Sequence, residues 1–137
     1  MNGTAERDET TAWSTRITGG ATAPFAAREL LTNRLGESVP ADTLHNVLLL
    51  TTELVTNSVR HAAVDEAGTV ELSVMSGPTL VRTSVIDPGG DTRPAVQDLD
   101  VNVPGGMGLF LVEQISTRWG VERMGDGATE VWFELAC

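Results

Sequence analysis

Lysine is absent from this 137-residue chain, and all nine of its basic residues are arginines. They face 19 acidic residues, so the formal net charge is −10. A chain of this charge is poorly suited to a broad contact with nucleic acid phosphates or with an anionic membrane surface. A single nucleotide stays possible, because a few backbone N–H groups and a metal ion can hold its phosphates. The composition therefore argues against nucleic acid and membrane partners.

The chain also has little cysteine and no long apolar run. Cys137 is the single cysteine, so an internal disulfide and a zinc cluster are both excluded. No purely apolar run is longer than Val47 to Leu50, which is far short of the roughly 20 residues that span a bilayer. The first residues show no basic-then-apolar signal pattern. We therefore expect a cytoplasmic protein.

The length of the chain predicts a single domain that needs no metal or disulfide to be stable. Residues 1–12 are polar, small and acidic, and we expect them to form a flexible tail. Residues 13–137 then form the domain.

Two helices are predicted in the first half of the chain. Residues 23–35 begin with a proline, end before a glycine and carry an apolar stripe of Phe25, Leu30, Leu31 and Leu35. Residues 40–62 show the strongest helical period, with an apolar face of Leu44, Leu48, Thr51, Val55 and Ala62. Glu53, Asn57 and Arg60 fall on the opposite face of this second helix.

Alternating apolar residues predict strands at 13–18, 70–75, 81–85, 119–124 and 129–135. The second and third of these are joined by Gly77-Pro78, which predicts an antiparallel hairpin. A third helix is predicted at 106–117, after a loop at 91–105 that shows no period. This order predicts an α/β (α+β) two-layer sandwich, with helices on one face of a mostly antiparallel sheet.

Three short patterns could carry chemistry, and the first is Glu53 with Asn57. A spacing of four puts the two side chains on adjacent turns of one helix face. The amide oxygen could hold a hydrated divalent cation while the carboxylate accepts a proton. The alternative for this pair is an ordinary solvated helix face.

The second pattern is Asp87-Pro88-Gly89-Gly90, which follows a predicted strand. A carboxylate held there can accept a hydrogen bond from an exocyclic amine, and a glycine lets a flat base approach the backbone. The alternative is a plain turn, in which Asp, Pro and Gly are the favoured residues.

The third pattern is Gly105-Gly106-Met107-Gly108-Leu109, which opens the third predicted helix. Unpaired N–H groups at a helix start bind phosphate, and glycines allow close approach. The pattern is not a P-loop, because that motif needs a lysine. The alternative is a flexible loop that enters a helix.

Taken together, these patterns resemble the ATPase superfamily of gyrase, the 90-kDa heat-shock chaperone, histidine kinases and mismatch-repair ATPases. Within it the chain is most similar to the small bacterial anti-sigma-factor serine kinases. The motifs that carry the resemblance are Glu53–Ala62 for the N box, Asp87-Pro-Gly89 for the adenine box, Gly106–Val112 for the second glycine box, and Gly127-Ala-Thr129. They occur in the family's order, and the resemblance covers residues 15–135 and implies the histidine kinase-like ATPase (Bergerat) fold.

The resemblance implies a role for each matched residue. Glu53 would be the general base, Asn57 would bind Mg²⁺, and Asp87 would accept from the adenine amine. The other residues implied to contact ATP are Arg60, His61, Gly89, Arg93, Gly106, Met107, Gly108, Leu109 and Thr129. Residues 91–105 would form the ATP lid.

The chain also departs from the family pattern. Asp91 occupies the position of the last glycine in the adenine box, and no helical hairpin with a phosphoacceptor histidine is present. A complete sensor kinase is therefore rejected.

Three functions stay open at this point. The first is an ATP-dependent serine/threonine kinase and anti-sigma factor that phosphorylates an anti-anti-sigma antagonist and regulates transcription by partner switching. The second is an ATP-binding regulator that sequesters a partner without significant turnover. The third is an α/β scaffold with chance motifs. For the first, the resemblance implies a sigma factor, the antagonist and a homodimer mate as partners, with ATP and Mg²⁺ as cofactors.

Overall fold

The computed structural model describes residues 10–88 and 108–137, which form one antiparallel sheet and three helices. The strands are β1 (Thr11–Thr18), β2 (Thr69–Ser76), β3 (Leu80–Asp87), β4 (Arg118–Arg123) and β5 (Thr129–Ala136). The helices are α2 (Ala23–Leu35), α3 (Ala41–His61) and α4 (Gly108–Ile115). The order in the sheet is β1-β2-β3-β5-β4, and every neighbouring pair is antiparallel.

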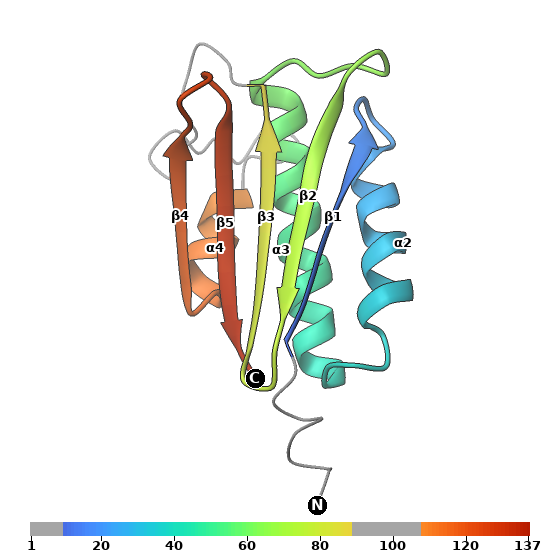
Figure 1. Ribbon diagram of the computed structural model, residues 1–137, viewed down its shortest axis with the longest axis vertical. Coiled ribbons are helices and arrows are strands. Elements are labelled where there is room, and N and C mark those ends of the chain that lie inside the picture. Colours follow the sequence, from blue (N-terminus) through green and yellow to red (C-terminus); the bar gives the residue numbers. More distant parts are fainter. Residues whose placement is uncertain (1–9, 89–107) are drawn as a thin grey trace, which may run out of the picture.

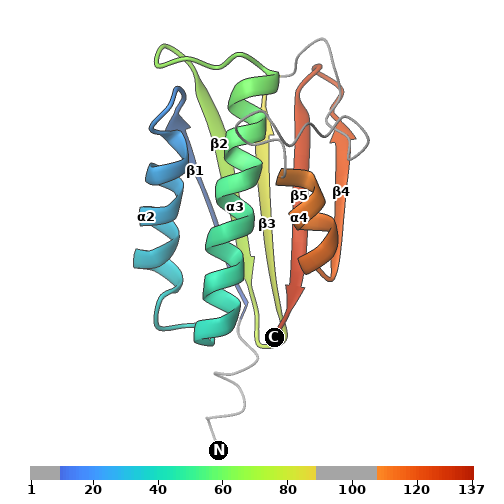
Figure 2. The ribbon, with the colours of Figure 1, turned by 180° about the vertical axis from the view of Figure 1, so that it is seen from behind.

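The helices lie on one face of the sheet, and the other face is covered by none of the described elements (Figures 1 and 2). Helix α3 lies in the middle of the helical layer and packs against α2, α4 and β3. The core lies between the two layers and combines side chains such as Leu31, Leu54, Leu72, Val85 and Phe133. Each fully buried side chain of this kind contributes roughly 1.5–3 kcal/mol. The predicted two-layer fold class is confirmed.

The local signals place most element boundaries correctly. Helix α2 has the predicted bounds and holds its proline in the first helical positions. Helix α3 follows Pro40, with an acidic residue in its first turn and Arg60 and His61 in its last. Acidic residues in the first turn and basic residues in the last turn both interact favourably with the helix dipole. The hairpin of β2 and β3 is confirmed by the register that pairs Glu71 with Ile86.

The apolar stripe predicted for α2 is partly wrong. Its buried residues are Ala23, Ala27, Leu31 and Leu35, which repeat every four positions. Phe25 lies on the other side of the helix and is 73% exposed. Because successive residues of a helix are rotated by about 100°, residues four positions apart lie on nearly the same face. Phe25 is two positions after Ala23 and is therefore rotated by about 200°, which places it on the opposite side.

The third predicted helix ends two residues early, at Ile115 instead of Thr117. The N–H group of Thr117 donates a hydrogen bond to the carbonyl oxygen of Glu134 in β5 at 2.8 Å. The Oγ1 atom of Thr117 accepts a second hydrogen bond from the N–H group of Ala136 at 3.0 Å. These bonds to β5 replace the helical ones and direct the chain into β4. The described helices include none that is both long and apolar enough to span a bilayer.

Candidate functional site

The described site residues come from four elements that meet at one end of the domain. Because β3 and β5 are antiparallel neighbours, the last residue of β3 lies beside the first residue of β5. Helix α3 ends at the same end of the molecule, and α4 begins on the side that faces it (Figure 2). The fold therefore brings together segments that are up to 76 positions apart, from Glu53 to Thr129.

Asp87 and Thr129 form the part of this site that lies on the sheet. Their Cα atoms are register partners, and their exposed fractions are 2% and 3%. Strand alternation points both side chains toward the helical layer, as it does for the buried Val85 and Val131 two residues away. A carboxylate and a hydroxyl at the end of a buried strand can both accept hydrogen bonds from a ligand. The pair fits the predicted contact with an exocyclic amine.

Glu53 and Asn57 form the part that lies on α3. Asn57 is 3% exposed, whereas the helical period predicted that it would lie on the face opposite the apolar one. That prediction is wrong because α3 is packed on three sides, by the sheet, α2 and α4, and only a narrow strip faces solvent. The ordinary solvated face is thus excluded for Asn57. Glu53 is half-buried, and this burial raises the pKa of its carboxyl above the usual value of 4.5.

Arg60 and His61 occupy the last turn of α3. Arg60 is exposed, but its Nη2 atom donates to the Oδ1 atom of Asn57 at 3.5 Å. This contact directs the guanidinium of Arg60 toward the buried amide. His61 is half-buried. One cation is thus held next to the proposed metal ligand, in a chain that has no lysine.

Gly108 and Leu109 form the first turn of α4. The side chain of Leu109 is 4% exposed and belongs to the core. It therefore anchors the helix, and only its backbone N–H group is available to a phosphate. Gly89, Arg93, Gly106 and Met107 lie outside the described residues, as does the predicted lid at 91–105.

The chemistry of these groups fits a magnesium nucleotide. Asn57 supplies an amide oxygen, which suits a hard cation, and Asp87 supplies a buried acceptor for an amine. The start of α4 supplies N–H groups for phosphate oxygens.

Sequence reasoning missed two buried hydroxyls of α3, on Thr51 and Ser58, which have no hydrogen-bond partner within the described residues. The two residues are seven positions apart, which places them on the same face of the helix, and this spacing is the signal in the sequence that could have revealed them.

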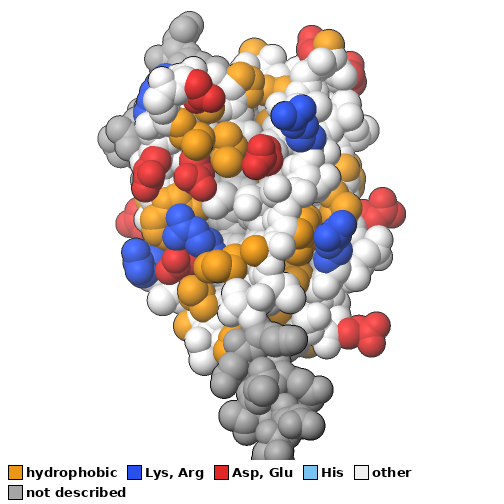
Figure 3. All heavy atoms as spheres, viewed as in Figure 1, with side chains coloured by type: hydrophobic (Ala, Val, Ile, Leu, Met, Phe, Trp, Pro, Cys, Tyr) orange, Lys and Arg blue, Asp and Glu red, His pale blue; other side chains and the backbone are white. Residues whose placement is uncertain are grey.

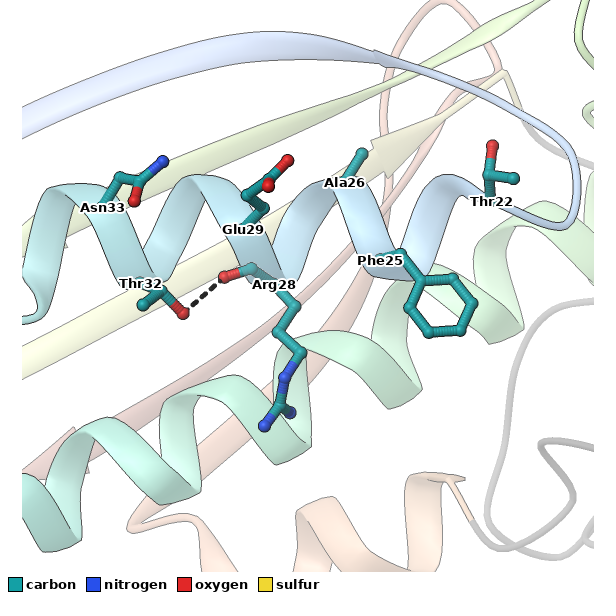
Figure 4. A pocket seen from close by; sticks show the side chains of 7 residues that line it. All are labelled: Thr22, Phe25, Ala26, Arg28, Glu29, Thr32 and Asn33. Carbon is teal, nitrogen blue, oxygen red and sulfur yellow. Dashed lines mark hydrogen bonds between the residues drawn. The ribbon is translucent and has the colours of Figure 1, made fainter.

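A hollow of about 640 Å³ lies on the outer face of α2 and contains none of the predicted site residues. Phe25 and Arg28 project on one side of it, and Thr32 donates to the carbonyl of Arg28 at 2.8 Å (Figure 4). Thr22, Ala26, Glu29 and Asn33 complete its lining. The hollow is a surface feature of one helix and is separate from the site described above.

Comparisons with known proteins agree with this geometry. The family model of the histidine kinase-like ATPase domain matches residues 21–135. A blue-light-activated histidine kinase of Erythrobacter litoralis is 39% identical over 87 residues, which cover 61% of this chain and 24% of that protein. The chain thus spans about a quarter of the length of this curated relative.

Two solved structures share the fold. A Mycobacterium tuberculosis protein with RsbU and RsbW domains superposes with a TM-score of 0.68 at 19% identity, over 91% of this chain and 32% of that one. A structure of the SiaB–SiaC complex from Pseudomonas aeruginosa gives a TM-score of 0.60 at 10% identity, over 98% of this chain and 94% of that one. The family model covers most of the chain, and the observed fold agrees with it. The chain therefore belongs to the family of histidine kinase-like ATPase domains.

Proposed function

We propose that this protein is an ATP-binding anti-sigma factor with serine/threonine kinase activity toward an anti-anti-sigma antagonist. ATP binding follows from membership of the ATPase family. The likeness to a chain with an RsbW domain and to the SiaB–SiaC complex supports a partner-switching role. In this role the protein acts in the cytoplasm, binds a sigma factor and forms a homodimer.

The observation that carries the kinase proposal is the pairing of Glu53 with Asn57 on α3. A general base works best when its pKa lies near the working pH, and burial moves Glu53 in that direction. Asn57 lies one turn further along, where its Oδ1 atom can hold Mg²⁺. When bound, ATP supplies the phosphoryl group. Glu53 accepts the proton of the substrate hydroxyl, and Arg60, which lies beside Asn57, supplies a positive charge for the phosphates.

Asp87 and Thr129 select the base in this proposal. The carboxylate of Asp87 accepts from the adenine amine, and Thr129 supports it from the neighbouring strand. Guanine presents a carbonyl at the equivalent position, so two acceptors would face each other at a cost of about 1–3 kcal/mol. Calorimetry with Mg²⁺ should therefore show ATP binding roughly 5 to 150 times more tightly than GTP. Equal affinities would contradict the assignment of Asp87.

The decisive experiment incubates the protein with labelled ATP, Mg²⁺ and candidate anti-anti-sigma proteins and then detects phosphoprotein. We expect transfer to a serine or threonine of one candidate, and loss of transfer in Glu53→Gln. Glu37→Gln is the matched control, because Glu37 is exposed and lies in the α2–α3 connection at the opposite end of the domain (Figure 1). ATP binding with no transfer to any candidate would favour the regulator that acts by sequestration alone.

A further inference from the structure

Two connections meet at the end of the domain where α3 ends (Figures 1 and 2). One is the turn between β1 and α2, which contains Gly19 and Gly20. The other is the loop at 62–68, which joins α3 to β2. The two segments are far apart in the sequence, yet their backbones are in direct contact. The contact of Gly19 and Gly20 with residues 62–68 is here called the glycine junction.

Two backbone hydrogen bonds hold the glycine junction together. The N–H group of Gly20 donates to the carbonyl oxygen of Val64 at 2.9 Å, and the N–H group of Gly19 donates to the carbonyl oxygen of Gly68 at 2.9 Å. Within the loop, the N–H group of Gly68 donates to the carbonyl oxygen of Asp65 at 3.0 Å. The side chain of Val64 is 6% exposed and belongs to the core. The loop is therefore fixed to the β1–α2 turn near both of its ends.

Only glycine lets the two backbones come this close. A Cβ atom at Gly19 would lie 2.5 Å from the carbonyl oxygen of Asp65 and 2.5 Å from the Cγ1 atom of Val64. Neither neighbour can move aside easily, because the first is backbone and the second belongs to a buried side chain. Gly20 has a φ of +86°, which is a left-handed conformation that glycine adopts without steric cost. Both positions therefore require glycine, one for space and one for conformation.

The end of α3 has a conformation that this contact helps to impose. Ala63 has a φ of +53°, although glycine is the usual residue at a left-handed helix end. The next N–H group, that of Val64, donates back to the carbonyl oxygen of Val59 at 3.0 Å. A residue other than glycine keeps such a conformation where the surrounding structure determines it. The hydrogen bond from Gly20 to Val64 is one such contact, so the junction helps to define how the chain leaves α3.

The last turn of α3 carries Arg60, one of the predicted phosphate contacts. Its carbonyl oxygen accepts a hydrogen bond from the N–H group of Ala63 at 3.3 Å. Its Nη2 atom donates to the Oδ1 atom of Asn57 at 3.5 Å. A displacement of residues 63–64 would therefore move the backbone of Arg60 and, with it, the guanidinium group that lies beside Asn57.

Gly20 is also the point to which the start of α2 is attached. Its carbonyl oxygen accepts a hydrogen bond from the N–H group of Ala23, the first residue of α2, at 3.2 Å. Ala23 is fully buried, as Val64 almost is. One glycine thus joins the start of α2 to the end of α3, and buried residues hold it on both sides.

From these contacts, we propose that Gly19 and Gly20 are positioning residues for the nucleotide phosphates and act through Arg60. The inference rests on the proposed function, in which Arg60 supplies a positive charge for the phosphates. It goes beyond that function because it gives a role in phosphate binding to a turn that contains none of the predicted site residues. A change in the junction should weaken ATP binding only where the guanidinium group of Arg60 is present.

The test is a double-variant cycle on the full chain, with ATP affinity measured by calorimetry in the presence of Mg²⁺. Gly19→Ala should lower the affinity roughly fivefold or more, as expected for partial loss of a contact to a charged group. Arg60→Ala should lower it by a similar or larger factor. In the Arg60→Ala background, Gly19→Ala should cause little further loss, because residues that act as one unit are not additive.

Two further variants separate positioning from general damage to the fold. Gly20→Ala is milder, because its Cβ atom would meet the flexible end of the Glu66 side chain at 2.7 Å. It should give a smaller loss of ATP affinity that also depends on Arg60. Gly125→Ala is the matched control, because a Cβ atom there has nothing within 4 Å. It should leave the affinity unchanged, and thermal unfolding shows whether each variant is folded.

Wild-type ATP affinity in folded Gly19→Ala and Gly20→Ala variants would overturn the positioning role. So would equal losses with and without the Arg60 side chain, which would show that the glycines act on the site by another route. Wild-type affinity in Arg60→Ala would overturn it as well. Failure of the wild-type protein to bind ATP would overturn the proposed function instead.

Discussion

The two faces of the sheet use the same five strands for different purposes. On β5, Phe133 faces the helices and is fully buried in the core, while the adjacent Trp132 faces away and lies under two arginines. The covered face is apolar along most of its length and becomes polar at one end, at Asp87 and Thr129. The face that the helices leave uncovered carries charged side chains, among them the ionic cluster of Arg82, Glu134 and Arg118 (Figure 3).

The difference shows where polar groups require a functional explanation. Charged residues on the uncovered face cost little, because water reaches most of them. Asp87, Asn57 and Thr129 are at most 3% exposed, and burying such groups is costly unless each finds a suitable partner. These three residues lie at one end of the covered face, where the candidate site was predicted. The following predictions test this contrast between the faces.

The largest effect is expected from Glu53→Gln. The substitution keeps the shape of the side chain and removes the proton acceptor, so phosphoryl transfer should fall roughly 10²–10⁴-fold. ATP affinity, measured by calorimetry, should stay near the wild-type value. Normal transfer in this variant would show that positioning alone carries the chemistry.

The wild-type rate should also depend on pH in a way that Glu53→Gln removes. Burial raises the pKa of Glu53, so the base is protonated and inactive until the pH exceeds that raised value. The rate should therefore increase with pH, with a midpoint above 4.5.

The free energy of unfolding should change with pH in the opposite direction to the rate. The folded state binds this proton more tightly, so the contribution of Glu53 to stability falls as pH rises through the window between the two pKa values. Denaturant titrations of both proteins across this window would measure it.

Phe133→Ala should give the largest loss of stability. Phe133 is fully buried between the layers, and its removal leaves a cavity that costs roughly 3–5 kcal/mol. Urea denaturation measures the change. A loss below about 1 kcal/mol would mean that the core closes around the missing ring.

Asp87→Asn should weaken ATP binding by a smaller but clear amount. The amide can present a donor to the adenine amine where the carboxylate presents an acceptor, which costs about 1–3 kcal/mol. The affinity should fall roughly 5- to 150-fold by calorimetry. Unchanged affinity for ATP, in a folded variant, would remove Asp87 from the site.

Arg82→Ala, on the uncovered face, should have the smallest effect on the monomer. The side chain contributes one ion pair and one contact with the face of Trp132, and Arg118 also reaches Glu134. We expect a loss of about 1 kcal/mol in urea denaturation of the monomer. A loss as large as that of Phe133→Ala would mean that the two faces contribute equally to stability.

The sequence by itself determined the elements and most of their ends. The 3.6-residue and two-residue periods depend on neighbours along the chain, which is why the bounds of α2 and the hairpin of β2 and β3 could be predicted. The candidate site was predicted by motif resemblance, and the structure brings its described parts to one end of the domain. The roles of the individual site residues stay predictions.

Only the tertiary structure decided which side chains are buried and which strands are neighbours. Phe25 belongs to an apolar-rich helix, but it is exposed because none of the described elements packs on that side of α2. Asn57 is buried because α3 is enclosed on three sides, and α4 ends early because Thr117 bonds to β5. Glu122 and Glu130 became neighbours only when β4 paired with β5. Each outcome depends on contacts between residues distant in the sequence or on packing between layers, which local periodicity does not encode.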